Sequence, residues 1–161
     1  MTKTRILYAA VIILVIVILV YTLSTSLPRH FSIPIHGEIT SGFGPRSAPK
    51  PGASTDHLAI DISTPVNTPV PAKFKGKVIS RYYTSNGGNQ LIVEHNGGWR
   101  SGYAHLNAYG KFKEGDTFNA GDIIAYTGNT GITTNPHLHY TLTTPAGVKV
   151  DPLLYVGKNL V

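Results

Sequence analysis

The stretch Pro136-His137-Leu138-His139-Tyr140-Thr141-Leu142 alternates polar and apolar side chains. Alternation with a period of two indicates a β-strand with one buried face, because successive side chains of a strand point to opposite faces. We therefore expect His137 and His139 to share the open face, while the apolar residues of the stretch enter the core. A helix would separate residues two positions apart, so this pair of histidines favours a strand.

A second stretch, Asp56-His57-Leu58-Ala59-Ile60-Asp61-Ile62, has a similar alternation. In a strand, His57, Ala59 and Asp61 would share one face, and the apolar residues between them the other. A helix would also bring His57 and Asp61 together, so this stretch alone leaves its local structure open. If both stretches are strands, their polar faces can converge on one metal ion. Histidine and carboxylate ligands hold zinc without cysteine, and the chain has no cysteine.

The predicted metal site has a plain alternative, since a single histidine in a sheet is usually a surface or hydrogen-bonded residue. We assign His30, His36 and His95 in that way. His105, in Tyr103-Ala104-His105-Leu106, lies in the sequence between the two stretches with metal-ligand spacing. A metal site with only three protein ligands keeps a position open for water, so the sequence indicates a reaction as well as a fold.

From Glu38 onward the chain is typical of β structure, with short β-branched and aromatic runs between Gly, Pro and Asn clusters. The predicted strands are residues 74–83, 89–95, 99–105, 122–127 and 137–143. Asn96-Gly97-Gly98 would join the second and third of them as a tight hairpin. For one domain within 161 residues, this pattern predicts a mainly β fold, an antiparallel sheet or a partly open β-sandwich.

The N-terminal residues 6–23 are apolar except for two tyrosines and a threonine, and they reach the lower length limit of a transmembrane helix. Lys3 and Arg5 precede this run and only Arg29 follows closely, which favours an N-inside orientation. A cleaved signal peptide is the alternative, with Ser24-Thr25-Ser26 as the cleavage region. We predict a cytoplasmic N-terminus at residues 1–5, an anchor at 6–23, a linker at 24–37 and an extracytoplasmic domain at 38–161.

The net charge of the chain is +6. A basic domain outside the cytoplasm is attracted to anionic polymers or lipid head groups. Most Lys and Arg residues are spread thinly, and Lys73-Phe74-Lys75-Gly76-Lys77 is the one cluster. Alternation along a strand would place its three lysines on one solvated face. We therefore expect no nucleic acid as a partner.

Several motifs follow one another between Ile39 and about Pro152. In chain order they are Thr40-Ser41-Gly42-Phe43-Gly44-Pro45-Arg46, His57-Leu58-Ala59-Ile60-Asp61, Thr64-Pro65-Val66-Asn67-Thr68-Pro69-Val70-Pro71-Ala72, Gly76-Lys77-Val78, Tyr103-Ala104-His105-Leu106, Gly121-Asp122, Gly128-Asn129-Thr130-Gly131 and Pro136-His137-Leu138-His139. In this order they resemble the lysostaphin-type (LytM-like) zinc metalloendopeptidases, which cleave peptides of the bacterial cell wall.

The resemblance implies one Zn²⁺ per chain, with His57, Asp61 and His139 as the metal ligands. It implies His105 and His137 as the catalytic histidines, a general base and a transition-state stabiliser, and leaves open which does which. The sequence departs from the family pattern in three places: Ala59 and Asn67 stand where the family has Gly, and Pro71 stands where a larger residue is common. Asn tolerates the left-handed backbone that Gly would otherwise supply.

The resemblance and the N-terminal run together predict a membrane-anchored zinc metalloendopeptidase that hydrolyses peptide bonds in peptidoglycan. It would remodel the wall, or serve entry or lysis if a phage encodes it. A catalytically silent module that binds peptidoglycan or activates another hydrolase is the alternative. The expected partners are wall peptides and the lipid bilayer, and no obligate protein partner is evident. Arg46 and Tyr103 are candidates for the substrate groove or for a structural role.

Overall fold

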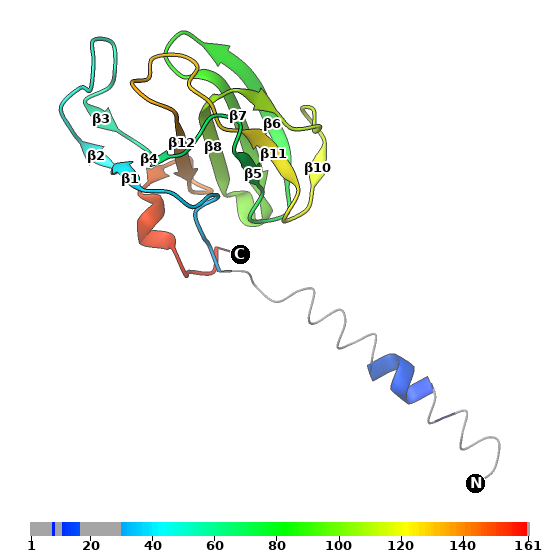
Figure 1. The fold of residues 1–161 in the computed structure, drawn as a ribbon. Helices are drawn as coiled ribbons and strands as arrows, with labels where there is room; N and C mark the ends of the chain where they lie inside the picture. The colour runs from blue at the N-terminus through cyan, green and yellow to red at the C-terminus, as the bar shows by residue number, and fades with distance from the viewer. Residues whose placement is uncertain (1–7, 9–10, 17–29, 161) are drawn as a thin grey trace.

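The computed structural model describes Tyr8, residues 11–16 and residues 30–160. Residues 11–16 are helical with exposed apolar side chains, and the chain from residue 30 onward is almost entirely β (Figure 1). Within the described residues, no helix has the length and apolar character needed to cross a membrane. Most of the predicted anchor at 6–23 lies outside the described residues, as do residues 1–5 and 24–29.

The central element is an antiparallel sheet with the strand order β1-β4-β12-β8-β7-β6-β10, in which β13 also pairs with β12. A smaller sheet has the order β5-β11-β9, and β2 pairs with β3. The bounds are β1 Ile39–Ser41, β2 Gly44–Pro45, β3 Asp56–His57, β4 Ile60–Ser63, β5 Pro69–Pro71, β6 Gly76–Thr84, β7 Gly88–His95, β8 Arg100–Leu106, β9 Ala108–Tyr109, β10 Thr117–Phe118, β11 Ile123–Tyr126, β12 His137–Thr143 and β13 Lys149–Val150, with 3₁₀ turns η1 at Asn96–Gly98 and η2 at Pro152–Tyr155.

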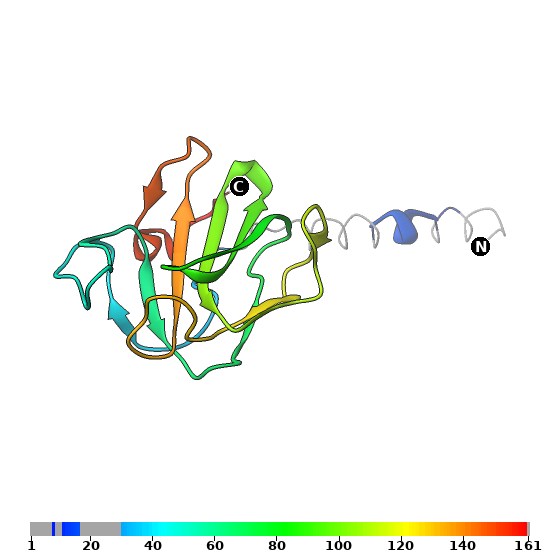
Figure 2. The same cartoon turned by 90° about the horizontal axis from the view of Figure 1, so that it is seen from above.

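The smaller sheet lies over one face of the central sheet (Figures 1 and 2). Val70 of β5 and Ile124 of β11 belong to the same buried cluster as Leu91 of β7 and Leu138 of β12. The core therefore sits between the two sheets, and the prediction of a mainly β, antiparallel fold is confirmed.

The strand β12 follows the predicted alternation. Leu138, Tyr140 and Leu142 are buried, whereas His137 and His139 are partly exposed. Its neighbours are β4 on one side and β8 on the other. This places the histidine face of β12 next to the strands that carry Asp61 and His105.

The stretch from His57 to Ile62 departs from simple alternation. The chain leaves the β2–β3 sheet after His57 and joins the central sheet at Ile60. Leu58, predicted to enter the core, is 39% exposed, and Ala59, predicted to share the ligand face, is fully buried. The prediction for Leu58 was wrong because one stretch supplies two short strands of different sheets.

The folded part of the chain begins before the predicted end of the linker at residue 37. Phe31 and Ile35 are buried in the core. The Phe31 amide donates to the carbonyl of Lys158, and the Gly157 amide donates to the carbonyl of Phe31. The Phe31 ring stacks against the Phe74 ring, with the two centroids 6.2 Å apart. The N-terminal and C-terminal ends of the described domain are therefore paired.

Candidate zinc site

The three predicted metal ligands converge at the boundary between the small β2–β3 sheet and the central sheet. Asp61 on β4 stands directly opposite His139 on β12 in the strand register, and His57 ends β3. His139 Nδ1 lies 2.9 Å from Asp61 Oδ1, and His57 Nε2 lies 3.2 Å from the same oxygen. The two imidazole nitrogens are 3.3 Å apart. Donor atoms far apart in the sequence thus surround one point.

Both the spacing and the chemistry of these donor atoms fit zinc. Around a tetrahedral ion with bonds of about 2.0–2.1 Å, neighbouring ligand atoms stand about 3.3 Å apart. His57 donates its Nδ1 proton to the carbonyl oxygen of Gly42 over 2.7 Å, so its Nε2 carries a lone pair toward the Asp61 carboxylate. Two lone pairs in contact repel each other, and a cation between them removes that repulsion.

The Asp61 carboxylate is the negative centre of the site. Burial by itself raises the pKa of Asp61, but the close imidazoles of His139 and His57 lower it well below its usual value. Its second oxygen, Oδ2, accepts from Arg46 Nη1 at 3.0 Å. Arg46 therefore holds the carboxylate in place while Oδ1 faces the two imidazoles. Arg46 belongs to the first sequence motif, but the sequence alone did not predict its ion pair with Asp61.

His105 and His137 lie beside the ligands, with ring centroids 4.7 Å apart. His105 donates its Nδ1 proton to the Thr130 carbonyl over 2.8 Å, and His137 donates its own to the Asn135 carbonyl over 2.8 Å. In the neutral form of each ring, Nε2 then carries the lone pair, and His137 Nε2 lies 3.6 Å from Asp61 Oδ1. Burial lowers the pKa of His105 to about 4, so this ring is neutral near pH 7.

The backbone of His105 adopts the left-handed conformation, with φ at 61°. Such a backbone at a non-glycine residue costs about 1–3 kcal/mol and persists only where its surroundings enforce it. Here the His105 amide donates to the Gly87 carbonyl over 2.8 Å. Gly128 packs so closely that a Cβ on it would lie 2.6 Å from the His105 carbonyl oxygen. Gly128 also bridges to His137, so one glycine positions both histidines.

A groove of about 770 Å³ contains the five predicted site residues. Residues 47–54, which join β2 to β3, line it together with residues 132–136 before β12. Lys50 Nζ donates to the Thr133 carbonyl over 2.6 Å and connects these two segments. Arg46 lines the groove, which is one of the two roles predicted for it from the sequence. Tyr103 is 3% exposed and packs on Tyr140, so its role is structural.

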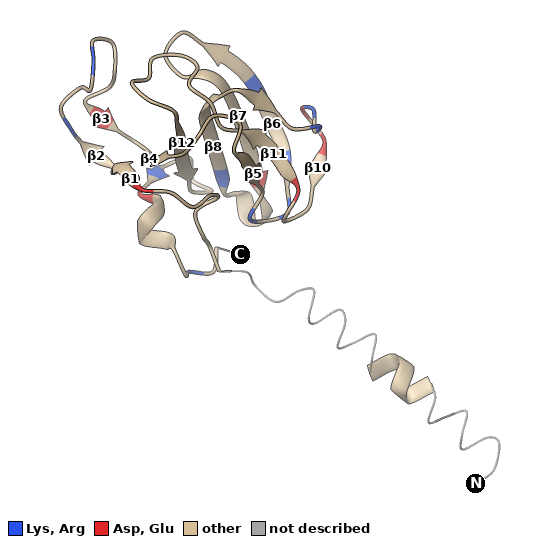
Figure 3. Ribbon diagram, viewed as in Figure 1, with Lys and Arg blue, Asp and Glu red and all other residues tan. Residues whose placement is uncertain are grey.

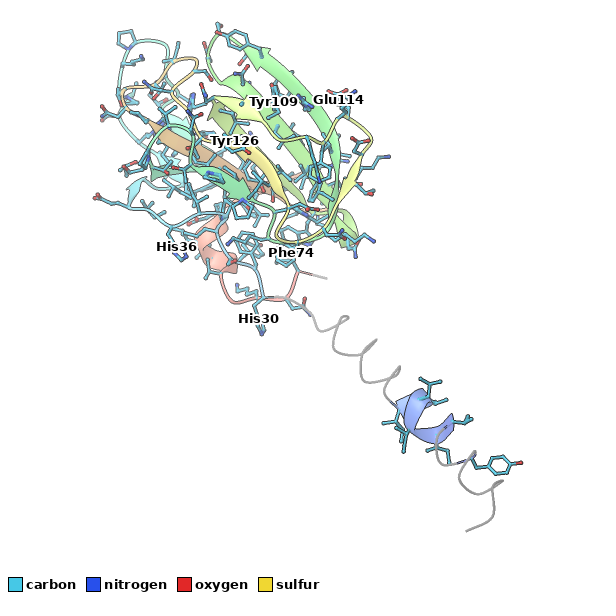
Figure 4. The ribbon with its side chains drawn as sticks, turned by 45° about the vertical axis from the view of Figure 1, so that its right-hand side comes forward. His30, His36, Phe74, Tyr109, Glu114 and Tyr126 are labelled. Carbon is cyan, nitrogen blue, oxygen red and sulfur yellow. The ribbon has the colours of Figure 1, made fainter. Side chains whose placement is uncertain are left out.

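The remaining histidines lie away from the site. His30 and His36 are exposed, and Figure 4 shows both at the lower edge of the domain. His95 accepts from the Ser101 hydroxyl at Nε2 over 3.0 Å, and the same hydroxyl contacts Tyr140. The prediction that these three histidines are surface or hydrogen-bonded residues is confirmed. Asn67, with φ at 66°, has the left-handed backbone that its place in the sequence predicted.

Residues 55–152 match the family described as Peptidase family M23. The chain belongs to this family. The Vibrio cholerae peptidoglycan DD-endopeptidase ShyB is 39% identical to it over 104 residues, which are 64% of this chain and 24% of that protein. The glycyl-glycine endopeptidase ALE-1 of Staphylococcus capitis is 39% identical over 101 residues, 62% of this chain and 27% of ALE-1. This chain therefore matches about a quarter of the length of these two relatives.

The same relationship holds for three-dimensional structure. A zinc-containing peptidase from Vibrio cholerae superposes on the M23 chain with a TM-score of 0.69 at 36% identity, covering 79% of this chain and 40% of the other. The family and the donor geometry agree on zinc as the cofactor. Among the residues of this M23 chain that the structure describes, the group that could hold the ion is His57, Asp61 and His139.

Proposed function

We propose that this M23 protein is a membrane-anchored zinc endopeptidase that hydrolyses peptide bonds of bacterial peptidoglycan. The observation that carries the proposal is the meeting of two groups of side chains in one groove. Three residues supply the donor atoms for the metal, and two further histidines lie beside them with Nδ1 bonded to a backbone carbonyl and Nε2 left for the reaction. A metal site that only stabilised the fold would need no such pair.

Zinc, when bound, polarises a carbonyl group and lowers the pKa of water to about 7. His57, Asp61 and His139 would hold it, and Arg46 keeps the carboxylate oriented. His105 and His137 each offer Nε2 to accept the proton of the attacking water. Once protonated, the same nitrogen donates to the oxyanion of the tetrahedral intermediate or passes the proton to the leaving amine. The carbonyls of Thr130 and Asn135 fix the orientation of both rings throughout.

The names of the relatives support the wall as the substrate but give two kinds of bond. ShyB is a peptidoglycan DD-endopeptidase and ALE-1 a glycyl-glycine endopeptidase. The groove has a volume of about 770 Å³ and is lined from Thr40 and Ser63, past the histidines, to Gln90, which suits a peptide ligand. We therefore propose peptide links of peptidoglycan as the substrate class.

The apolar run at residues 6–23 supports anchoring to a membrane with the M23 domain on the wall side. Of its described residues, Tyr8 and Val11 to Ile16 are all more than half exposed. An uninterrupted apolar surface of that kind is stable in lipid rather than in water. The excess of positive charge before the run gives the N-inside orientation.

Digestion of purified cell walls tests the proposal. The zinc-loaded protein should release peptides or new amino termini from at least one of two wall types, one with glycine cross-bridges and one with direct links. His137→Ala should lower the rate about 10²–10⁴-fold, the usual contribution of a proton-transferring side chain, with its zinc content unchanged. His36→Ala, which removes an exposed histidine, should leave the rate unchanged. A zinc-loaded protein that binds both wall types and cleaves neither would make it a silent binding module.

A further inference from the structure

A group of apolar side chains is exposed at the C-terminal 3₁₀ turn η2. Leu153 is 40% exposed, Leu154 is 65% exposed and Val156 is 50% exposed. The turn itself is well formed, because the Asp151 carboxylate caps it by accepting from the Leu153 amide over 2.9 Å. Tyr155 packs against Trp99 with the ring centroids 5.2 Å apart. The exposed residues are thus presented on a fixed turn.

This turn lies beside the point where the N-terminal part of the chain enters the domain. Residues 157 and 158, just after the turn, form backbone hydrogen bonds with Phe31. Figure 1 shows η2, drawn as a red coil, on the lower side of the domain. In Figure 4 the labelled His30, His36 and Phe74 also lie along this lower edge. The start of the domain at Phe31 is therefore close to the exposed leucines.

Lysines surround the same region. Phe74, which stacks on Phe31, has Lys73 and Lys75 as its chain neighbours. Lys158 follows η2, with Nζ 5.0 Å above the ring of Tyr155. Within the part of the chain that the structure describes, none of the three lysines has a carboxylate within ion-pair distance. Asp151, which caps η2, is the acidic residue of this turn, and over the rest of the domain basic and acidic residues are interspersed (Figure 3).

We propose that Leu153, Leu154 and Val156, together with Lys73, Lys75 and Lys158, form a lipid-docking face that rests on an anionic bilayer. The proposal builds on the membrane anchor of the proposed function. Apolar side chains that insert at the head-group boundary, with lysines contacting anionic lipid, are the pattern of an interfacial membrane contact. The anchor supplies the proximity, since it holds the face next to the bilayer at a high effective concentration.

Docking through this face would fix the direction in which the groove opens. Trp99, which contacts η2 through Tyr155, immediately precedes β8, and His105 lies near the other end of that strand. A strand of this length separates its ends by about 20 Å. The catalytic histidines would therefore be held away from the head groups and toward the wall, while the short N-terminal connection prevents the domain from drifting out.

The single tryptophan makes the docking measurable, because Trp99 is the only one in the chain. We suggest reconstituting the full chain into vesicles of phosphatidylglycerol and phosphatidylethanolamine that carry a spin-label quencher on the lipid head group. The fluorescence of Trp99 should be quenched, and the quenching should fall by at least about twofold in zwitterionic vesicles or at high salt. Leu154→Asp and Lys158→Glu should each reduce it by a similar factor. Tyr83→Asp is the matched control, since Tyr83 is 64% exposed and lies outside the face.

Equal quenching in wild type, Leu154→Asp and Lys158→Glu would overturn the docking face. Quenching that depends on protein density rather than on lipid charge would assign the face to a second copy of the chain and also overturn it. Flotation of the same vesicles tests the anchor separately, and digestion of soluble wall fragments tests catalysis. Leu154→Asp should float with the vesicles and digest the fragments as the wild type does.

Discussion

The two halves of the site are held in different ways. The ligand half is built on strand register, because Asp61 on β4 pairs directly with His139 on β12. The proposed catalytic half, His105 and His137, depends on carbonyls of the loop that precedes β12. A sheet gives its positions great precision, whereas a loop must be fixed by close packing. Metal binding and proton transfer should therefore fail separately when each half is disturbed.

Removing the centre of the ligand half should have the largest effect. Asp61→Ala takes away one donor atom and leaves Arg46 next to two imidazoles, so zinc should no longer bind at stoichiometric level. Loss of the metal removes several kcal/mol of transition-state stabilisation, which corresponds to about 10³-fold or more in the rate. Zinc content by elemental analysis and wall digestion should fall together. Full zinc occupancy in this variant would show that Asp61 is not a ligand.

A change in the loop should disturb the catalytic half alone. In Gly128→Ala the new Cβ would lie 2.3 Å from the Asn107 amide nitrogen and 2.6 Å from the His105 carbonyl oxygen. Backbone atoms at these distances must move, and a displacement near 1 Å can cost about 10²-fold in kcat. Zinc stoichiometry should remain unchanged.

Gly42→Ala is the matched control for that loop change. A Cβ at Gly42 meets no atom within 4 Å, and the carbonyl that accepts from His57 remains. We expect wild-type kcat and wild-type zinc content in this variant. If both glycine variants lose the same activity, the idea that the loop specifically positions the two histidines is wrong.

A subtler change should weaken the ligand half without abolishing it. Arg46→Lys keeps the positive charge but loses the planar guanidinium, whose Nη1 donates to Asp61 and the Ser41 hydroxyl while its Nε donates to the Ser54 carbonyl. Partners that orient a metal ligand usually contribute about 10–100-fold to metal affinity. Competition with a coloured chelator should show zinc affinity lowered by about that factor, while kcat at saturating zinc stays close to wild type. Arg100→Lys, in an exposed pair with Glu94, should leave both unchanged.

The regularity of each segment decided how far its sequence could be interpreted. In β12 the period of two placed every side chain correctly, because one strand with one neighbour on each side obeys the alternation. At Leu58 the same rule failed, because the chain passes from one sheet to another there and the local sequence pattern gives no sign of that change. Phe31 and Ile35 were missed as core residues. The short segment around them contains prolines and histidines and resembles a linker until its tertiary contacts are known.

The contacts that orient the site residues were beyond the sequence for a different reason. Thr130 and Asn135 act through backbone carbonyls, which every residue has, so their residue types carry no signal. The sequence also shows no sign of the left-handed backbone of His105, since few non-glycine residues adopt that conformation even though histidine does so more often than most. The motif at residues 128–131 did contain a clue, because glycine is common where two backbones approach closely.

His95 lies outside both halves of the site. A change at His95 should have the smallest effect of those considered, and this effect is on stability. Burial lowers the pKa of His95, opposed by its hydrogen bond to the Lys75 carbonyl and by the charge of Glu94. Below about pH 6.5 the His95 side chain is protonated in the unfolded chain but stays neutral in the folded chain. The contribution of His95 to the free energy of unfolding should therefore be fully present above that pH and decrease as the pH falls. One such proton contributes at most about 1.4 kcal/mol per pH unit. In His95→Gln the free energy of unfolding, from denaturant titrations at a series of pH values, should fall less steeply than in wild type between pH 6.5 and the lowered pKa. Identical slopes would mean that His95 is protonated as readily in the folded chain as in the unfolded one.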